Sequence, residues 1–196
     1  MRAGLLLAPG AGAGRDQSAL VAIDAAATRA GAVVTRMDFP YRKAGRRAPD
    51  REPVLLAAVR GEVDGLASRS GLPASRLVLG GRSMGGRMCS IAAATTPPDG
   101  IGVLGLALIS YPLHPPGRPE KLRTAHFGDL QVPCLFVSGT KDAFGSPGEL
   151  EEASACIPGS VTHVWIDGKD HALRGADDTV AVAVVGWMLE VAGSGP

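Results

Sequence analysis

Short runs of consecutive apolar residues alternate along this chain with longer segments of helical character. Continuous apolar runs of four to eight residues are typical of strands that are buried on both faces, and their alternation with helices predicts a parallel sheet covered on both sides. The predicted strands cover residues 3–8, 32–37, 76–80, 103–110, 132–138 and 161–166. The predicted helices cover about residues 17–30, 53–70, 84–94, 121–127, 149–156 and 177–191, and a turn is expected at Pro98-Asp99-Gly100. We therefore expect an α/β fold with about six mostly parallel strands.

The strongest turn signal is Gly81-Arg82-Ser83-Met84-Gly85, between the third predicted strand and the helix that follows it. This segment matches the G-x-S-x-G pattern in the strand–turn–helix context that the pattern requires. Small residues two positions either side of Ser83 allow a sharp turn that lifts the serine hydroxyl above the sheet. The alternative is an ordinary glycine-rich turn, because the chain holds 27 glycines. The flanking strand and helix favour a nucleophilic serine.

Two further polar residues follow later predicted strands. Asp142 comes after the fifth strand and His171 after the sixth. In a parallel sheet, functional groups gather beyond the carboxyl ends of the strands. A serine needs an imidazole to accept its proton, and the imidazole needs a carboxylate to orient it. We predict Ser83 as nucleophile, Asp142 as acid and His171 as base, with Asp167 and Asp170 as alternatives for the acid.

The loop after the first strand, Pro9-Gly10-Ala11-Gly12-Ala13-Gly14, carries almost no side chains. Such a loop brings its backbone amides close to a reacting group. We expect the amide of Met84, together with that of Ala11 or Gly12, to stabilise an oxyanion; a merely flexible turn is the alternative. The glycine spacing differs from G-x-G-x-x-G, which gives little support to dinucleotide binding.

Four segments together resemble a group of small bacterial α/β-hydrolases that are related to dienelactone hydrolases. They are Gly81-Arg82-Ser83-Met84-Gly85-Gly86, residues 9–14, Asp38-Phe39-Pro40-Tyr41-Arg42 and Tyr111-Pro112-Leu113-His114-Pro115. The resemblance covers nearly the whole chain and implies a single α/β-hydrolase domain over residues 1–196. It also implies a lidless serine hydrolase whose nucleophile, acid and base occur in this chain order. Among the residues of these segments, the candidates for contacts with substrate are Tyr41, Arg42, Tyr111 and His114.

The chain departs from this family in three places. The first antiparallel hairpin of larger members is missing, because the sequence opens on the first parallel strand. Pro9 stands where many relatives have a histidine. Dienelactone hydrolases proper use a cysteine nucleophile, whereas this chain has Ser83, so their substrate is not carried over.

The segment from Ser110 to Leu130 is too short for a substantial cap domain, which predicts an open site suited to small esters. Hydrolysis of small carboxylic esters through an acyl-enzyme is the leading function. The alternatives are thioester or amide hydrolysis by the same residues, and a non-catalytic protein that binds a ligand or a partner protein. The basic loop that carries Arg42, Arg46 and Arg47 suggests a preference for anionic substrates. Its alternative is a solvated loop paired with local acids.

Composition narrows the classes of partner. The net charge is +1 and aromatic residues make up 4% of the chain, so neither nucleic acid nor a membrane surface is expected as partner. Cys89, Cys134 and Cys156 have no metal-binding spacing. The apolar start of the chain is too short for a signal peptide. We expect a cytoplasmic monomer or homodimer that uses no metal or organic cofactor.

Overall fold

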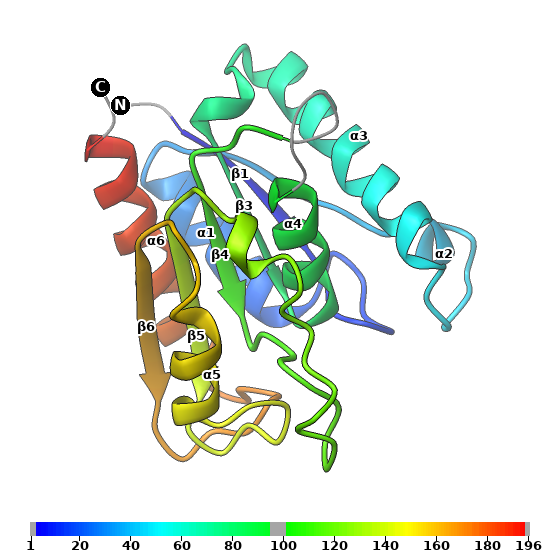
Figure 1. The fold of residues 1–196 in the computed structure, drawn as a ribbon. Helices are drawn as coiled ribbons and strands as arrows, with labels where there is room; N and C mark the ends of the chain where they lie inside the picture. The colour runs from blue at the N-terminus through cyan, green and yellow to red at the C-terminus, as the bar shows by residue number, and fades with distance from the viewer. Residues whose placement is uncertain (1–2, 95–100, 195–196) are drawn as a thin grey trace.

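The computed structural model describes residues 3–94 and 101–194, and it contains one parallel sheet (Figure 1). Its strands are β1 (Gly4–Ala8), β2 (Val33–Arg36), β3 (Leu77–Arg82), β4 (Gly105–Ile109), β5 (Cys134–Gly139) and β6 (Val161–Ile166). The six strands lie in the order β2-β1-β3-β4-β5-β6, and each strand runs parallel to its neighbours. The carboxyl ends of all these strands therefore meet at one edge of the sheet.

Helices cover both faces of the sheet. The helices are α1 (Ser18–Arg29), α2 (Pro40–Lys43), α3 (Glu52–Ser70), α4 (Met84–Ala94), α5 (Pro147–Ser154) and α6 (Asp177–Ser194), with short 3-10 helices η1 (Ala74–Arg76) and η2 (Phe127–Asp129). Helices α1 and α6 pack together on one face, while α3 and α4 pack together on the other (Figure 1). This arrangement confirms the predicted α/β-hydrolase fold class.

The alternation of side chains along each strand divides the core into two layers. Leu5 and Leu7 of β1 point into the layer beneath α1 and α6. Leu6 and Ala8 of the same strand point into the layer beneath α3 and α4. Since both faces are apolar, the strands appear in the sequence as continuous hydrophobic runs.

The helix predicted over residues 121–127 does not form. The Arg123 amide donates instead to the Leu113 carbonyl at 2.8 Å, and the Arg123 carbonyl accepts from the Tyr111 hydroxyl at 2.6 Å. These bonds take up the Arg123 amide and carbonyl, which a helix would use for its own backbone hydrogen bonds. The helical turn that does form in this segment is η2, which begins at Phe127. The predicted turn at residues 98–100 lies outside the described residues.

Candidate active site

Ser83 occupies a sharp turn between β3 and α4. Its φ of 50° lies in the left-handed region, which is costly for a residue with a side chain. The Ser83 amide donates to the Ile109 carbonyl at 2.8 Å and so ties the turn to β4. A Cβ atom on Gly81 would lie 2.7 Å from the Ala8 carbonyl oxygen, and one on Gly85 would lie 2.5 Å from that of Pro9. Glycine at both positions is therefore a steric requirement of this turn.

A chain of hydrogen bonds joins Ser83 to the residues that follow β5 and β6. His171 Nε2 lies 2.9 Å from Ser83 Oγ, and His171 Nδ1 lies 2.8 Å from Asp142 Oδ2. The Asp142 side chain is 1% exposed and that of His171 is 21% exposed, so the carboxylate is shielded while the imidazole reaches solvent. The structure thus brings together the three residues that were predicted as nucleophile, acid and base.

The two alternative acids are engaged elsewhere. Asp167 Oδ1 accepts a hydrogen bond from the Thr140 hydroxyl at 3.1 Å. Asp170 Oδ1 accepts one from the Ala172 amide at 2.9 Å. Neither carboxylate contacts the imidazole of His171, which leaves Asp142 as the partner of that imidazole.

Phe144 also belongs to this site, and no sequence pattern pointed to it. Its ring stacks on the His171 imidazole with centroids 4.1 Å apart. Its amide donates to Asp142 Oδ1 at 2.8 Å. One residue therefore holds both the carboxylate and the ring that the carboxylate orients.

The loop after β1 passes directly over the serine. A Cβ atom on Gly10 would lie 3.7 Å from Ser83 Cβ. The Gly10 amide donates to Gln17 Oε1 at 3.1 Å, and the Gly12 amide donates to the Tyr41 hydroxyl at 3.2 Å. The amide of Ala11 has no acceptor within the described residues. Of the two loop amides predicted for an oxyanion site, only that of Ala11 is available, and the prediction for Gly12 is corrected.

The prediction that Tyr41 and Tyr111 contact substrate is also wrong. Tyr41 is completely buried and stacks on Phe39. Tyr111 is 2% exposed and packs against Phe127 and Phe136 in the core. Each hydroxyl bonds to the backbone of a neighbouring loop, so both tyrosines support loops rather than face solvent.

The other two residues predicted to contact substrate are Arg42, which lies in α2 after β2, and His114, which lies in the loop after β4. His114 is 5% exposed, and its Nε2 lies 3.6 Å from Glu149 Oε1. Arg42 donates to the Arg46 carbonyl at 3.3 Å, and Arg46 forms an ion pair with Asp50 at 2.7 Å. These contacts favour a basic loop paired with local groups over one that selects anionic substrates.

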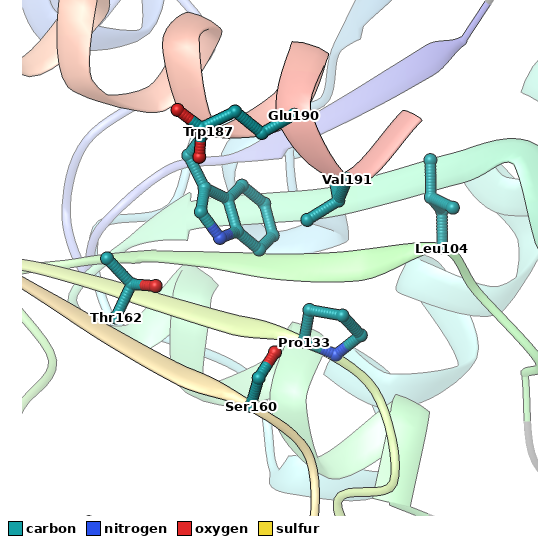
Figure 2. Close-up of a pocket in the computed structure, with 7 residues that line it drawn as sticks. All are labelled: Leu104, Pro133, Ser160, Thr162, Trp187, Glu190 and Val191. Carbon is teal, nitrogen blue, oxygen red and sulfur yellow. The ribbon is translucent and has the colours of Figure 1, made fainter. Parts of the chain in front are cut away.

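One apolar hollow beside α6 lies far from the serine. Its volume is about 450 Å³, and Figure 2 shows its lining, which includes Trp187, Leu104 and Pro133. Leu104 and Pro133 precede β4 and β5, so this hollow lies at the amino ends of the strands, opposite Ser83. Three further hollows are lined by residues around Asp38, around Arg87 and between α1 and α6. None of these four hollows includes Ser83 or His171.

The part of the chain that the structure describes holds neither a metal-binding cluster nor a membrane-spanning helix. No group of three or more His, Cys, Asp or Glu side chains in that part of the chain is arranged to hold a metal ion. Across residues 3–94 and 101–194, no helix combines the length and apolar character needed to cross a bilayer.

Solved structures share this fold at low sequence identity. An alpha-beta serine hydrolase homologue from Coxiella burnetii superposes with a TM-score of 0.76 at 15% identity, over 94% of this chain and 84% of that chain. Est1E from Butyrivibrio proteoclasticus gives a TM-score of 0.78 at 16% identity, over 98% and 89% of the two chains. A dienelactone hydrolase from Anabaena variabilis gives a TM-score of 0.70 at 20% identity, over 96% of this chain and 86% of that chain.

The sequence itself carries a family signature. Residues 1–181 match the family model described as "Alpha/beta hydrolase domain". The match spans every element from β1 to the start of α6, including the serine turn and both partner loops. It confirms the resemblance to the α/β-hydrolase superfamily that the motifs indicated. The chain belongs to the alpha/beta hydrolase domain family.

Proposed function

We propose that this protein is a serine hydrolase that cleaves small carboxylic esters through an acyl-enzyme on Ser83. The observation that carries the proposal is the hydrogen-bonded chain Ser83–His171–Asp142 at a strained strand–helix turn. An imidazole 2.9 Å from the hydroxyl is within the distance that proton transfer requires. The shielded carboxylate fixes the tautomer that leaves Nε2 free to accept the proton.

In the first half of the reaction, Ser83 Oγ attacks the ester carbonyl carbon and its proton moves to His171 Nε2. The carbonyl oxygen becomes an oxyanion, for which the amides of Met84 and Ala11 are the donors. Met84 opens α4, so its amide has no intrahelical partner. Collapse of this intermediate breaks the bond to the alcohol oxygen, which takes the proton from His171. The acyl group remains on Ser83.

In the second half, a water molecule attacks the acyl carbon and gives its proton to His171 Nε2. Collapse of the second intermediate returns that proton to Ser83 and releases the carboxylic acid. The Asp142 carboxylate stabilises the imidazolium in both halves. All these steps use groups of this chain and water.

The substrate class rests on the openness of the site. The connection from β4 to β5 contains only η2 in addition to coil and turns, so no cap encloses Ser83. Structural relatives include lipolytic enzymes from a metagenome, a monoacylglycerol lipase from Paleococcus ferrophilus and Est1E with ferulic acid bound. These relatives support ester chemistry, and the shallow site favours small acyl groups.

Initial rates on p-nitrophenyl esters of short acids, with a matching thioester and anilide, test the proposal. We expect hydrolysis of the short esters, and a loss of about 10³-fold or more in kcat for Ser83→Ala. Ser90→Ala is the matched control, because Ser90 also bonds to a histidine ring, at 2.8 Å from His126 Nε2, and should keep wild-type kcat. Equal rates for wild type and Ser83→Ala would contradict the proposal. Preference for the thioester or anilide would keep the mechanism and change the substrate class.

A further inference from the structure

Arg82 immediately precedes the serine and is the last residue of β3. Side chains two and four positions apart on a strand share a face, so Arg82 points to the same side as Val78, which lies in the layer beneath α1 and α6. Arg82 is half-buried, and its guanidinium reaches the backbone of the loop after β6. Its position places a cation between the strand that carries the nucleophile and the loop that carries His171.

The guanidinium makes one direct contact with that loop. Arg82 Nη2 donates to the carbonyl oxygen of His171 at 2.5 Å. Burial lowers the pKa of the Arg82 guanidinium, and three nearby carboxylates oppose this shift. They are the carboxylates of Asp142, Asp177 and Asp170. Arginine remains protonated despite such a shift, so the bond to the His171 carbonyl is a charge-assisted one.

The loop between β6 and α6 needs such an anchor. It contains no helix or strand from Asp167 to Ala176. Leu173, two residues after His171, is buried and has a φ of 52°, a costly conformation for a branched side chain. A backbone in this conformation persists only when surrounding contacts hold it. The bond from Arg82 is a contact of this kind, made to the backbone of the base itself.

We propose that Arg82 is a positioning residue that fixes His171 relative to Ser83. Because Arg82 and Ser83 are consecutive, the bond to the His171 carbonyl connects nucleophile and base through the backbone, independently of the Ser83–His171 hydrogen bond. Loss of this connection lets the imidazole move while substrate still reaches the open site. The inference rests on the proposed function, and it adds a residue that touches neither substrate nor the reacting atoms.

The experiment compares Arg82→Met, Arg82→Lys and Arg123→Met with wild type. Met fills similar space without a donor, whereas Lys keeps a cation and a donor. Arg123 is the matched control, because it is also half-buried with a pKa lowered by burial and donates to a loop carbonyl, that of Pro112 at 3.3 Å. The measurements are kcat and KM on the best ester, the rate of inactivation by a fluorophosphonate, and the thermal unfolding midpoint.

We expect Arg82→Met to lower kcat and the inactivation rate by about 10- to 100-fold, the effect of a misplacement on the order of 1 Å, with KM nearly unchanged. Arg82→Lys should recover part of that loss, and Arg123→Met should retain wild-type kcat. In wild type we expect a deshielded proton resonance from His171 Nδ1, which lies 2.8 Å from Asp142 Oδ2. That resonance should weaken in a folded Arg82→Met, which a purely structural role would not predict. If the Met variant does not fold, the Lys variant and its proton resonance decide the question.

Three results would overturn the inference. They are an unchanged kcat in a folded Arg82→Met, equal losses in Arg82→Met and Arg123→Met, and a rise in KM without a fall in kcat. Failure of the proposed function is distinguishable, because it would leave wild type itself unreactive toward the fluorophosphonate and the esters.

Discussion

At the scale of single residues, the site depends on side chains that never touch solvent. Tyr41 is completely buried, and its hydroxyl accepts the hydrogen bond of the Gly12 amide at 3.2 Å. This bond holds the loop whose Ala11 amide is the proposed oxyanion donor. A buried tyrosine of α2 therefore supports a backbone group next to the nucleophile.

Tyr41→Phe should lower both stability and kcat. The variant leaves the Gly12 amide without its acceptor, which costs about 1 kcal/mol in the free energy of unfolding, and it frees the loop beside Ser83. Tyr111→Phe is the control, since it removes a similar bond, to the Arg123 carbonyl at 2.6 Å. Urea denaturation should show comparable losses for the two variants, while kcat falls several-fold only in Tyr41→Phe. A fall of the same size in Tyr111→Phe would contradict this role of Tyr41.

At the scale of elements, the turn from β3 to α4 depends on close backbone approach. The positions of Gly81 and Gly85 against the β1 strand end leave no room for a Cβ atom. The same contacts bring the β1 loop over the nucleophile. One strand–turn–helix unit thus sets the position of the serine, of the first helix amides and of the neighbouring loop.

Gly85→Ala should destabilise the protein by about 1–3 kcal/mol, the usual cost of overpacking, and abolish ester hydrolysis. Its Cβ atom would lie 2.5 Å from the Pro9 carbonyl oxygen. Gly186→Ala, in the interior of α6, is the matched substitution, because a Cβ atom there meets nothing within 4 Å. This second variant should gain about 0.5–1 kcal/mol from helix propensity. Urea midpoints that move in the same direction for both variants would contradict the steric argument.

The sequence predicted the turn and the three polar residues because each lies at a strand end, and strand ends were visible as breaks in apolar runs. It did not predict Phe144, since a stacking partner carries no pattern of its own. It also misplaced Tyr41 and Tyr111, because an aromatic residue beside a strand end looks the same whether it faces substrate or the core. The sequence could not exclude the Gly12 amide as an oxyanion donor, because it does not show that this amide donates to the Tyr41 hydroxyl.

At the scale of the whole molecule, half-buried imidazoles link stability to pH. Burial, with a smaller contribution from the charge of Arg87, lowers the pKa of His126 to about 4 from its ordinary value of 6.5. Burial also lowers the pKa of His163. At these two imidazoles the unfolded chain therefore binds more protons than the folded one below about pH 6.5, and the stability that they contribute should fall as the pH drops from about 6.5 to about 4.

His126→Gln should weaken the dependence of stability on pH. Gln keeps a donor toward Ser90, whose hydroxyl lies 2.8 Å from His126 Nε2, but it does not titrate. Urea midpoints at several values between pH 7 and pH 4 should fall less steeply for the variant than for wild type. Identical slopes would mean that other groups account for the acid sensitivity.

The central claim is that Ser83 is an activated nucleophile, and intact-mass spectrometry after treatment with a fluorophosphonate tests it most directly. The account predicts a single phosphonyl adduct on wild type and none on Ser83→Ala, because the reagent reacts only with a serine whose proton can pass to a base. A folded wild-type protein that gains no adduct would contradict the account. The chain would then be a hydrolase-fold protein that binds a ligand or a partner without catalysis.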